Sequence, residues 1–479
     1  MTLPLDSLNA ETAGVARAYL TQAGVPGASV TVVSGDRIYH LSHGVKAVST
    51  GAPVTADTSF PIASCSKAFA SAAMASLVAD GLASWDDPVS KHLPEFKLYD
   101  PEVTAKVTLR DLAGNRLGLP REGLVEFGLA KHLAPEENFE RLQYTQPAHL
   151  LRTKATYVNP GHTAIAVIAG RIAGKSFVET LRERVLAPLG MTGTSGGARA
   201  PSELADLAAM HIHLDGQVVE IETAYSDLDL GSNGMFVSGV DAGQWLRLHL
   251  NGGLVDGKQV IPRDALKETH KPQITANPGE ITPSLVHPGA HLGAYALGWA
   301  VADLDGVPLV THSGGELGAC TITMLFPRQG VGVAVYLNSL SLGIMPVSYA
   351  IAASVLGLPA RDWFSVFAGV TPQPQPRPPR VELADLTPYL GRFVHPGDGP
   401  LVISVENGAP VARLTDGYKA EFRMIPLGDH TFELDCFHNE MKGLAAIALP
   451  RLRFDVTDGR ASAAHVQFTA SRTFLRTGD

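Results

Sequence analysis

Residues 60–82 read FPIASCSKAFASAAMASLVADGL, a turn-like segment followed by an apolar helix that we predict over Ser66 to Leu82. Ser64 and Lys67 stand three residues apart at the start of this helix, so their side chains share one face. The helix dipole and free N–H groups there stabilise a developing anion, and a desolvated lysine can become neutral enough to accept a hydroxyl proton. The non-catalytic alternative is that Ser64 only caps the helix and that Lys67 is solvated. The helix is too apolar for a surface location, so we favour a serine nucleophile with a lysine base.

Tyr157-Val158-Asn159 precedes Pro160-Gly161 and a helical run, so we place it on a loop that enters a helix. Residues two apart in an extended chain point the same way, and the phenol and the amide can therefore face one cleft. A second match, Tyr336-Leu337-Asn338, lies in an apolar β-run, where a core tyrosine and a strand-end asparagine explain it.

His312-Ser313-Gly314-Gly315 ends a predicted strand and begins a glycine pair. Glycine allows the backbone to approach a ligand closely. A lone histidine at such a place is more often structural, so this motif takes its weight from its order and spacing relative to the first two.

In the order Ser-x-x-Lys, Tyr-x-Asn, His-x-Gly, the three motifs resemble the active-site signature of the serine β-lactamase/penicillin-binding-protein superfamily. The branch that fits best contains class C β-lactamases, DD-carboxypeptidases, D-aminopeptidases and related esterases. The resemblance covers about Leu8 to Leu358. Lesser features similar to this family are Thr108-Leu-Arg-Asp-Leu112, Gly118-Leu-Pro120, Pro188-Leu-Gly-Met-Thr192, Gly231-Ser-Asn-Gly-Met235 and Gly298-Trp299.

The resemblance implies a role for each motif residue. Ser64 would attack the carbonyl, while Lys67 and Tyr157 pass protons and Tyr157 also protonates the leaving group. Asn159 would orient Lys67 and the substrate amide. The oxyanion would lie between the backbone N–H groups of Ser64 and Gly315, each donor being worth roughly 10² to 10³ in rate at comparable sites.

The third motif departs from the β-lactamase pattern. His312 would contact the hydroxyl network or the polar end of the substrate, and Gly314 with Gly315 would line the substrate. β-Lactamases usually carry lysine where His312 stands, so the fixed cation that would meet a β-lactam carboxylate is missing. Arg116, in Asn115-Arg116-Leu117, places a guanidinium where a small hydroxyl is usual, and we expect it to alter substrate access. We therefore expect weak or no β-lactamase activity.

Strand patterns at both ends of the first 370 residues, with helices between them, predict an α+β fold. It would be a β-lactamase/DD-peptidase-like antiparallel sheet, assembled from both ends, flanked by helices and carrying an inserted helical lobe. The predicted helices are Asn9 to Ala23, Ser66 to Leu82, Leu109 to Ala113, Thr163 to Ile172, Phe177 to Ala187, Val240 to Leu250 and Ser341 to Leu356. The predicted strands are Ala28 to Val33, Arg37 to His43, Tyr295 to Ala302, Val307 to Thr311, Ala319 to Phe326 and Val331 to Leu337.

The C-terminal hundred residues have a different pattern. Alternating prolines in Thr371-Pro-Gln-Pro-Gln-Pro-Arg-Pro-Pro379 predict an extended linker, because they sustain neither helix nor sheet. Short alternating runs after it predict a small all-β, lipocalin-like barrel. We thus expect a hydrolase domain over 1–370, a Pro-rich linker over 371–380 and a β-barrel domain over 381–479, and we hypothesise that one barrel loop covers the cleft. The barrel strands are predicted at Leu401 to Val405, Phe422 to Pro426, Thr431 to Leu434, Leu452 to Val456 and Ala464 to Thr469.

Three other patterns match known kinds of site. Gly193-Thr-Ser195-Gly-Gly197 matches the Gly-x-Ser-x-Gly elbow, but it follows a helix end, so we interpret it as a loop. His211-Ile-His213 has no third ligand at a metal-site spacing and is expected to be structural. Cys65 stands beside the predicted nucleophile, and we favour a packed thiol over a reactive one. No metal or other cofactor is indicated.

Composition narrows the partners. The chain has 38 Lys+Arg against 47 Asp+Glu, and this net charge of -9 includes no basic block that would favour nucleic acid or an anionic membrane. Its three cysteines are widely separated, which gives no disulfide framework. No apolar run is long enough to span a bilayer. The start, MTLPLDSLNAETAG, lacks the basic and apolar regions of a secretory signal, so we expect a cytoplasmic protein, a removed leader being the alternative.

The function expected from the sequence is a serine hydrolase that forms an acyl-enzyme on Ser64 and cleaves an amide or ester bond of a small molecule. The His-x-Gly variant resembles peptidase branches, which favours D-amino-acid peptides or amides. A carboxylesterase is the first alternative. A penicillin-binding or sensor protein that is acylated without turnover is the alternative from another class, and a homo-oligomer is left open.

Overall fold

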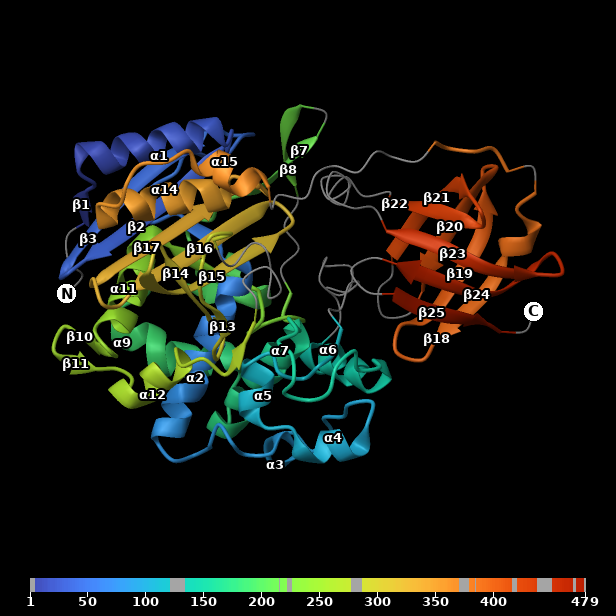
Figure 1. The fold of residues 1–479 in the computed structure, drawn as a ribbon, viewed down its shortest axis with the longest axis horizontal. Coiled ribbons are helices and arrows are strands. Elements are labelled where there is room, and N and C mark those ends of the chain that lie inside the picture. The colour runs from blue at the N-terminus through green and yellow to red at the C-terminus, as the bar shows by residue number, and fades with distance from the viewer. Residues whose placement is uncertain are drawn as a thin grey trace.

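The computed structural model describes residues 5–120, 134–214, 216–221, 226–276, 287–369, 379–383, 385–415, 420–436, 450–467 and 471–477. Figure 1 shows a larger body, in which helices cover a sheet, and a β-barrel formed by the C-terminal part of the chain. The predicted α+β fold class with a small all-β barrel is confirmed.

The main sheet of the body joins its two ends. Its strand order is β1-β3-β2-β17-β16-β15-β14-β13-β12, with β4 paired to β3. Strand β2 pairs antiparallel with β17, Val32 standing opposite Val333, so the N-terminal hairpin and the late strands form one sheet as predicted. Strand β1 pairs parallel with β3 and was not predicted. The bounds are β1 (Leu5–Ser7), β2 (Gly27–Ser34), β3 (Arg37–Ala47), β4 (Ala52–Pro53), β12 (Ile274–Thr275), β13 (Gly293–Tyr295), β14 (Ala300–Leu304), β15 (Val307–Glu316), β16 (Ala319–Phe326) and β17 (Val331–Leu337).

Two helical layers cover the sheet. On one face α1 (Ala10–Gln22), α14 (Ile344–Leu356) and α15 (Trp363–Ala368) share an apolar core with residues such as Val30 and Val335. On the other face α2 (Ser66–Ala79), α11 (Gly239–Leu250) and α12 (Arg263–Thr269) belong to a larger core. Figure 1 shows α1 and α14 on one side of the sheet and α2 and α11 on the other. Burial on both faces explains why β2 and β17 are nearly continuous apolar runs.

The helical lobe lies beside α2. Its elements are α3 (Val89–His92), α4 (Pro101–Lys106), α5 (Leu109–Ala113), α6 (Pro135–Glu140), η3 (Arg141–Tyr144), α7 (Asn159–Ala173), α8 (Phe177–Leu181), the π-turn η4 (Arg182–Leu186) and α9 (Ala187–Leu189). The smaller elements of the body are β5 (Ser59–Pro61), η1 (Ala63–Cys65), β6 (Ser195–Gly196), η5 (Gly197–Arg199), α10 (Ala200–Glu203), β7 (Met210–Leu214), β8 (Gln217–Ile221), β9 (Met235–Ser238), β10 (Leu254–Val255) and β11 (Lys258–Gln259). Helix α7 packs against α2, so the lobe and the sheet body share the predicted nucleophile helix.

Two predicted strands differ from the structure. The strand predicted over Tyr295 to Ala302 is two strands, β13 and β14, separated by a turn in which Gly298 has φ +77°. A Cβ at Gly298 would lie 2.7 Å from the carbonyl oxygen of Lys67, so the turn approaches helix α2 too closely for any side chain. Strand β15 continues past Thr311 to Glu316, so His312 lies inside the strand and does not end it.

Two predicted elements of the lobe also differ. The helix predicted over Phe177 to Ala187 is interrupted by the π-turn η4. The Gly-x-Ser-x-Gly match forms the short strand β6 and the turn η5 where a loop was expected, and Ser195 Oγ there binds Glu203.

The C-terminal barrel closes through eight strands in chain order. They are β18 (Gly391–His395), β19 (Gly399–Glu406), β20 (Ala409–Leu414), β21 (Ala420–Gly428), β22 (Thr431–Cys436), β23 (Arg451–Thr457), β24 (Arg460–Gln467) and β25 (Ser471–Arg476), after the turn η6 (Thr387–Tyr389). Strand β18 pairs with β25, which closes the barrel. Residues 371–378 of the predicted linker lie outside the described residues. Three ranges of the barrel region, 416–419, 437–449 and 468–470, also lie outside them. The predicted domain bounds and the predicted cleft-covering loop therefore stay predictions.

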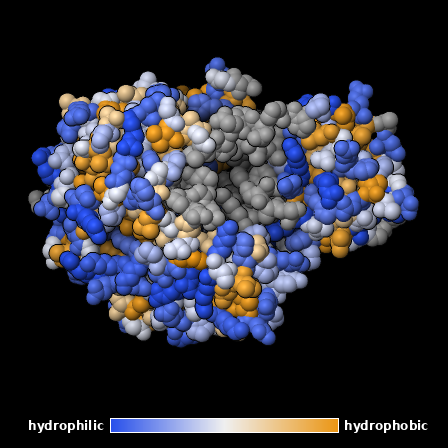
Figure 2. All heavy atoms as spheres, viewed as in Figure 1, coloured by the Kyte–Doolittle hydropathy of each residue, from blue (hydrophilic) through white to orange (hydrophobic). Residues whose placement is uncertain are grey.

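No helix in the described ranges combines the length and the apolar character needed to cross a membrane. On the face shown in Figure 2, polar and apolar residues are interspersed over the described surface.

Candidate active site

Ser64 lies in the turn η1, directly before helix α2. The preceding Ala63 has φ +44°, a left-handed conformation that costs a residue with a side chain free energy and often marks functional sites. Ser64 is half-buried while Ala63 and Cys65 are buried. The turn thus presents the serine hydroxyl at the N-terminal end of a buried helix.

Lys67 lies one turn along the helix and is completely buried, with 0% of its surface exposed. Its Nζ donates to Ser64 Oγ at 3.0 Å and to the carbonyl oxygen of Ser232 at 2.7 Å. Low-dielectric surroundings disfavour an ammonium ion relative to a neutral amine. This amine is therefore within reach of Ser64 Oγ and desolvated, as a proton acceptor for Ser64 requires.

Tyr157 completes the group around Lys67. Its ring centre lies 4.7 Å from Lys67 Nζ and 6.1 Å from the ring of His312, and the tyrosine is 8% exposed. The next residue, Val158, donates its backbone N–H to Asn115 Oδ1 at 3.0 Å. Helix α7 begins at Asn159, which is half-buried. The structure therefore brings together the Ser-x-x-Lys, Tyr-x-Asn and His-x-Gly segments.

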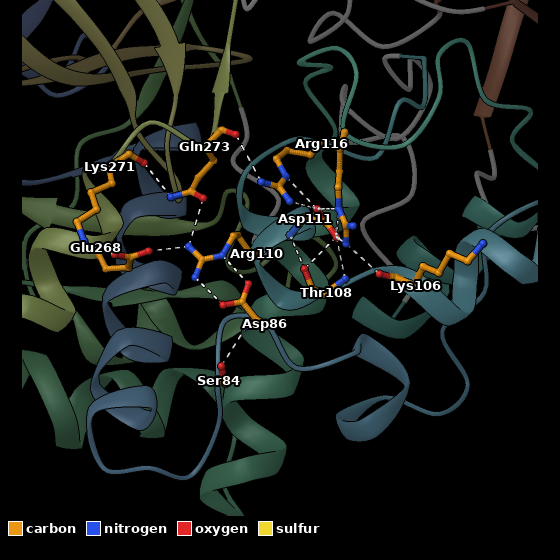
Figure 3. Close-up of polar contacts among 11 residues, drawn as sticks. Ser84, Asp86, Lys106, Thr108, Arg110, Asp111, Arg116, Glu268, Lys271 and Gln273 are labelled. Carbon is orange, nitrogen blue, oxygen red and sulfur yellow. Dashed lines mark hydrogen bonds and ion pairs between the residues drawn. The ribbon is translucent and has the colours of Figure 1, made fainter.

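The loop that holds Tyr157 is braced by a buried carboxylate. Arg116 Nε donates to Asp111 Oδ1 at 2.8 Å, and Arg152 donates to both oxygens of Asp111, as Figure 3 shows for the labelled Arg116 and Asp111. Burial opposes ionisation of Asp111, but the hydrogen bonds from Arg152, Thr108 and Arg116 outweigh it and lower its pKa. The Arg116 guanidinium is bound to Asp111, which differs from the expected role in substrate access.

His312 is completely buried in β15, and its Nε2 lies 3.0 Å from the hydroxyl of Tyr295. Burial, and next the positive charge that Lys67 carries when it is protonated, lower the pKa of His312 to about 3. The ring is therefore neutral at physiological pH, in keeping with the expected absence of a fixed cation at the third motif.

Strand β15 approaches the Ser64 turn closely at Gly314. A Cβ there would lie 2.6 Å from Thr321 Oγ1 and 2.9 Å from Ala63 Cβ, and it would also collide with the carbonyl oxygen of Ile62. Thr321 Oγ1 in turn donates to Ile62 O at 2.8 Å. Only glycine fits this contact, which holds the Gly314-Gly315 backbone against η1.

Cys65 is a packed thiol, as expected. Its sulfur donates to the carbonyl oxygen of His312 at 3.1 Å, and burial raises its pKa to about 11. At neutral pH it is therefore uncharged and a poor nucleophile.

Of the histidine pair in β7, His211 makes a hydrogen bond to the backbone and belongs to no group of three possible metal ligands among the described residues. His211 is buried, and its Nδ1 lies 2.8 Å from the carbonyl oxygen of Asn338. Within the described ranges no three His, Cys, Asp or Glu side chains are grouped to hold a metal ion.

Three residues beside the site were not predicted from the sequence. Tyr295 contacts the rings of both Tyr157 and His312, and burial raises its pKa well above the usual value. His162, one turn into α7, is buried against Tyr295. Burial, and next the positive charge of Lys67 when it is protonated, lower the pKa of His162 well below the usual value. Ser232 supplies the carbonyl that binds Lys67, and only its place in the Gly-Ser-Asn-Gly stretch signalled it.

Comparisons with known proteins agree with this architecture. A sequence model of the beta-lactamase family matches residues 12–352. The chain is similar to penicillin-binding protein 4 of Amycolatopsis lactamdurans, with 26% identity over 397 residues that cover 79% of this chain and 96% of that protein. It is also similar to the unguisins hydrolase ungD of Aspergillus violaceofuscus, with 24% identity over 421 residues, 80% of this chain and 74% of that protein.

Solved structures share the fold over nearly the whole chain. The octameric penicillin-binding protein homologue from Pyrococcus abyssi superposes with a TM-score of 0.64 at 19% identity, covering 97% of this chain and 99% of that one. SurE, solved with D-Leu, superposes with a TM-score of 0.57 at 18% identity, covering 98% and 99%. Because the family model spans well over half of its residues, this chain belongs to the beta-lactamase family of serine hydrolases.

Proposed function

We propose that the protein hydrolyses an amide bond of a small substrate through an acyl-enzyme on Ser64, with a preference for D-amino-acid peptides or amides. The observation that carries the proposal is the buried Lys67, whose Nζ lies 3.0 Å from Ser64 Oγ. A nucleophile within hydrogen-bond reach of its base is the arrangement that covalent catalysis requires.

In the acylation step, Ser64 Oγ forms a bond to the substrate carbonyl carbon while its proton passes to the neutral amine of Lys67. The carbonyl oxygen becomes an oxyanion, which the backbone N–H groups of Ser64 and Gly315 would stabilise. The tetrahedral intermediate then collapses, the C–N bond breaks and the leaving amine takes a proton through Tyr157. This step leaves an ester on Ser64, with Lys67 and Tyr157 restored to their starting protonation states.

Deacylation reverses the roles with water as the nucleophile. The neutral Lys67 amine accepts a proton from the water, directly or through the Tyr157 hydroxyl, while the water oxygen attacks the ester carbon. Ser64 then leaves as the alcohol when it regains that proton. His312 is neutral, so it would act here through hydrogen bonding with Tyr295 and not as a charge.

The substrate class is inferred from the third motif and from relatives. A neutral His312 offers no cation to a β-lactam carboxylate, so we expect weak or no β-lactamase activity. A protein whose structure was solved with D-Leu is among the similar proteins, which favours D-configured substrates. A hydrolase of unguisins is also among them, in keeping with a hydrolytic reaction. An ester substrate would use the same residues.

The test joins covalent labelling to a substrate screen. A fluorophosphonate probe should label the wild-type protein on the peptide that contains Ser64 and should leave Ser64→Ala unlabelled. Sustained turnover should be faster with D-aminoacyl anilides than with L-aminoacyl anilides or a chromogenic cephalosporin. Faster turnover of short acyl esters would identify a carboxylesterase, a burst that stops after one equivalent would identify a sensor, and unlabelled Ser64 in active protein would overturn the proposal.

A further inference from the structure

We infer that the C-terminal barrel positions the catalytic lysine, by packing on the loop whose carbonyl binds Lys67 and on the end of strand β15. This inference rests on the proposed function, since it concerns the same Ser64 and Lys67. It assigns the barrel a part in the chemistry itself, carried by contacts in the described residues.

The first contact is made by Leu228, in the loop before Ser232. Leu228 is 2% exposed and belongs to the apolar core of the barrel, together with residues such as Phe393 and Phe474. A leucine of the hydrolase body thus occupies the barrel core. Burying such a side chain stabilises the docked arrangement.

The same loop holds the lysine. Ser232 lies four residues after Leu228, its backbone N–H and its Oγ both bind the carbonyl oxygen of Asp229, and its own carbonyl accepts from Lys67 Nζ at 2.7 Å. The Leu228 carbonyl accepts from Asn138 Nδ2 of helix α6 at 3.2 Å. The tight turn therefore transmits the position of Leu228 to the carbonyl that binds the amine.

The barrel also touches the end of the strand that carries the third motif. Leu317, directly after β15, packs against the barrel core. Asn233 of the Ser232 loop donates to Glu316 at 3.4 Å, which joins this strand end to the loop. The Ser232 loop, through Leu228, and the end of β15, through Leu317, therefore both contact the barrel core, and they contact each other.

A buried ion cluster fixes the barrel to the lobe. Asp398, 4% exposed and directly before β19, lies 2.9 Å from His395 Nδ1 and 3.4 Å from both Arg472 of the barrel and Arg141 of turn η3. Arg141 also donates to the carbonyl oxygen of Gly397 at 2.9 Å. Turn η3 directly follows α6, whose Asn138 donates a hydrogen bond to the Leu228 carbonyl. The ion cluster therefore holds the barrel next to the helix that is bonded to the Leu228 loop.

The test replaces Leu228 and a matched leucine of the same core. Leu228→Ala should lower kcat of the full-length enzyme by about 10-fold to 100-fold, the cost of misplacing a catalytic group by about 1 Å, with little change in KM. The acid limb of the kcat profile should move to lower pH, because an ammonium that loses a carbonyl acceptor is less stable. Leu228→Met, which keeps the apolar volume, should restore most of the activity.

Leu452→Ala is the control, since Leu452 is equally buried in the barrel core but belongs to strand β23 of the barrel itself. It should destabilise the barrel with a much smaller change in kcat and an unchanged pH profile. Arg141→Ala gives an independent test without a cavity and should lower kcat in the same direction. Equal effects of Leu228→Ala and Leu452→Ala, or wild-type kinetics for Leu228→Ala, would overturn the inference. Failure of the wild-type protein to acylate Ser64 would instead overturn the proposed function.

Discussion

Gly314→Ala tests whether strand β15 holds the Ser64 turn in its reactive place. The new Cβ would lie 2.9 Å from Ala63 Cβ and 2.6 Å from Thr321 Oγ1. Relaxed carbon–carbon contacts are about 3.5–4.0 Å and carbon–oxygen contacts about 3.3–3.6 Å, so the strand and the turn must separate by roughly 1 Å. A displacement of that size at a reacting group costs about 100-fold in rate.

The assay is steady-state hydrolysis of a nitrophenyl ester, with thermal unfolding measured in parallel. We expect Gly314→Ala to lose about 100-fold in kcat/KM while it remains folded, since overpacking costs about 1–3 kcal/mol of stability. Gly315→Ala is the matched comparison, because a Cβ there would have no described atom beyond its chain neighbours within 4 Å, and the N–H is retained. It should keep at least about tenfold more activity than Gly314→Ala, a difference of about 1.4 kcal/mol. Equal activity of the two variants would refute the reasoning.

Two further predictions concern stability. Asp111→Asn should lower the free energy of unfolding by about 2 kcal/mol, because Arg116 and Arg152 both lose a charged acceptor. Urea denaturation measures this loss. An unchanged urea midpoint would contradict the idea that Asp111 holds the Tyr157 loop in place. Burial raises the pKa of Asp241 to about 6 from 3.8, so the folded state holds its proton more tightly, and the stability that this gives is present below pH 3.8 and is lost as pH rises through 6. The stability of Asp241→Asn relative to wild type should therefore rise by up to about 3 kcal/mol between pH 4 and pH 8. The asparagine carbonyl can still accept the hydrogen bond from Thr194 that Asp241 accepts. A stability difference that does not change with pH would contradict this.

Local patterns predicted the elements whose ends are set by neighbouring residues. Helix α5 begins and ends where predicted because Thr108 and Asp111 form a capping box at its start and Gly114 follows it. Strand β17 also has its predicted bounds, since both of its faces are buried between turns. In the barrel, β18, β20 and β25 were not predicted, because these short runs gain their stability mainly from neighbouring strands.

Elements shaped by tertiary contacts could not be predicted in this way. The β13–β14 turn exists because Gly298 must pass the backbone of Lys67, a residue more than two hundred positions away. The three motifs gave Ser64, Lys67, Tyr157 and the His-x-Gly segment, whose grouping the structure shows. Tyr295 carries no local signal and is identified only by its contact with His312.

The most direct test of the account is the rate at which a fluorophosphonate probe labels Ser64 with and without the lysine amine. Lys67→Met keeps the buried apolar stem and removes the amine, and Ser64→Ala gives the background. If the Lys67 amine activates the hydroxyl, the second-order labelling rate of Lys67→Met should fall by about 10² to 10⁴ at neutral pH, the usual contribution of a general base. A folded Lys67→Met protein that labels within a few-fold of the wild-type rate would contradict the claim.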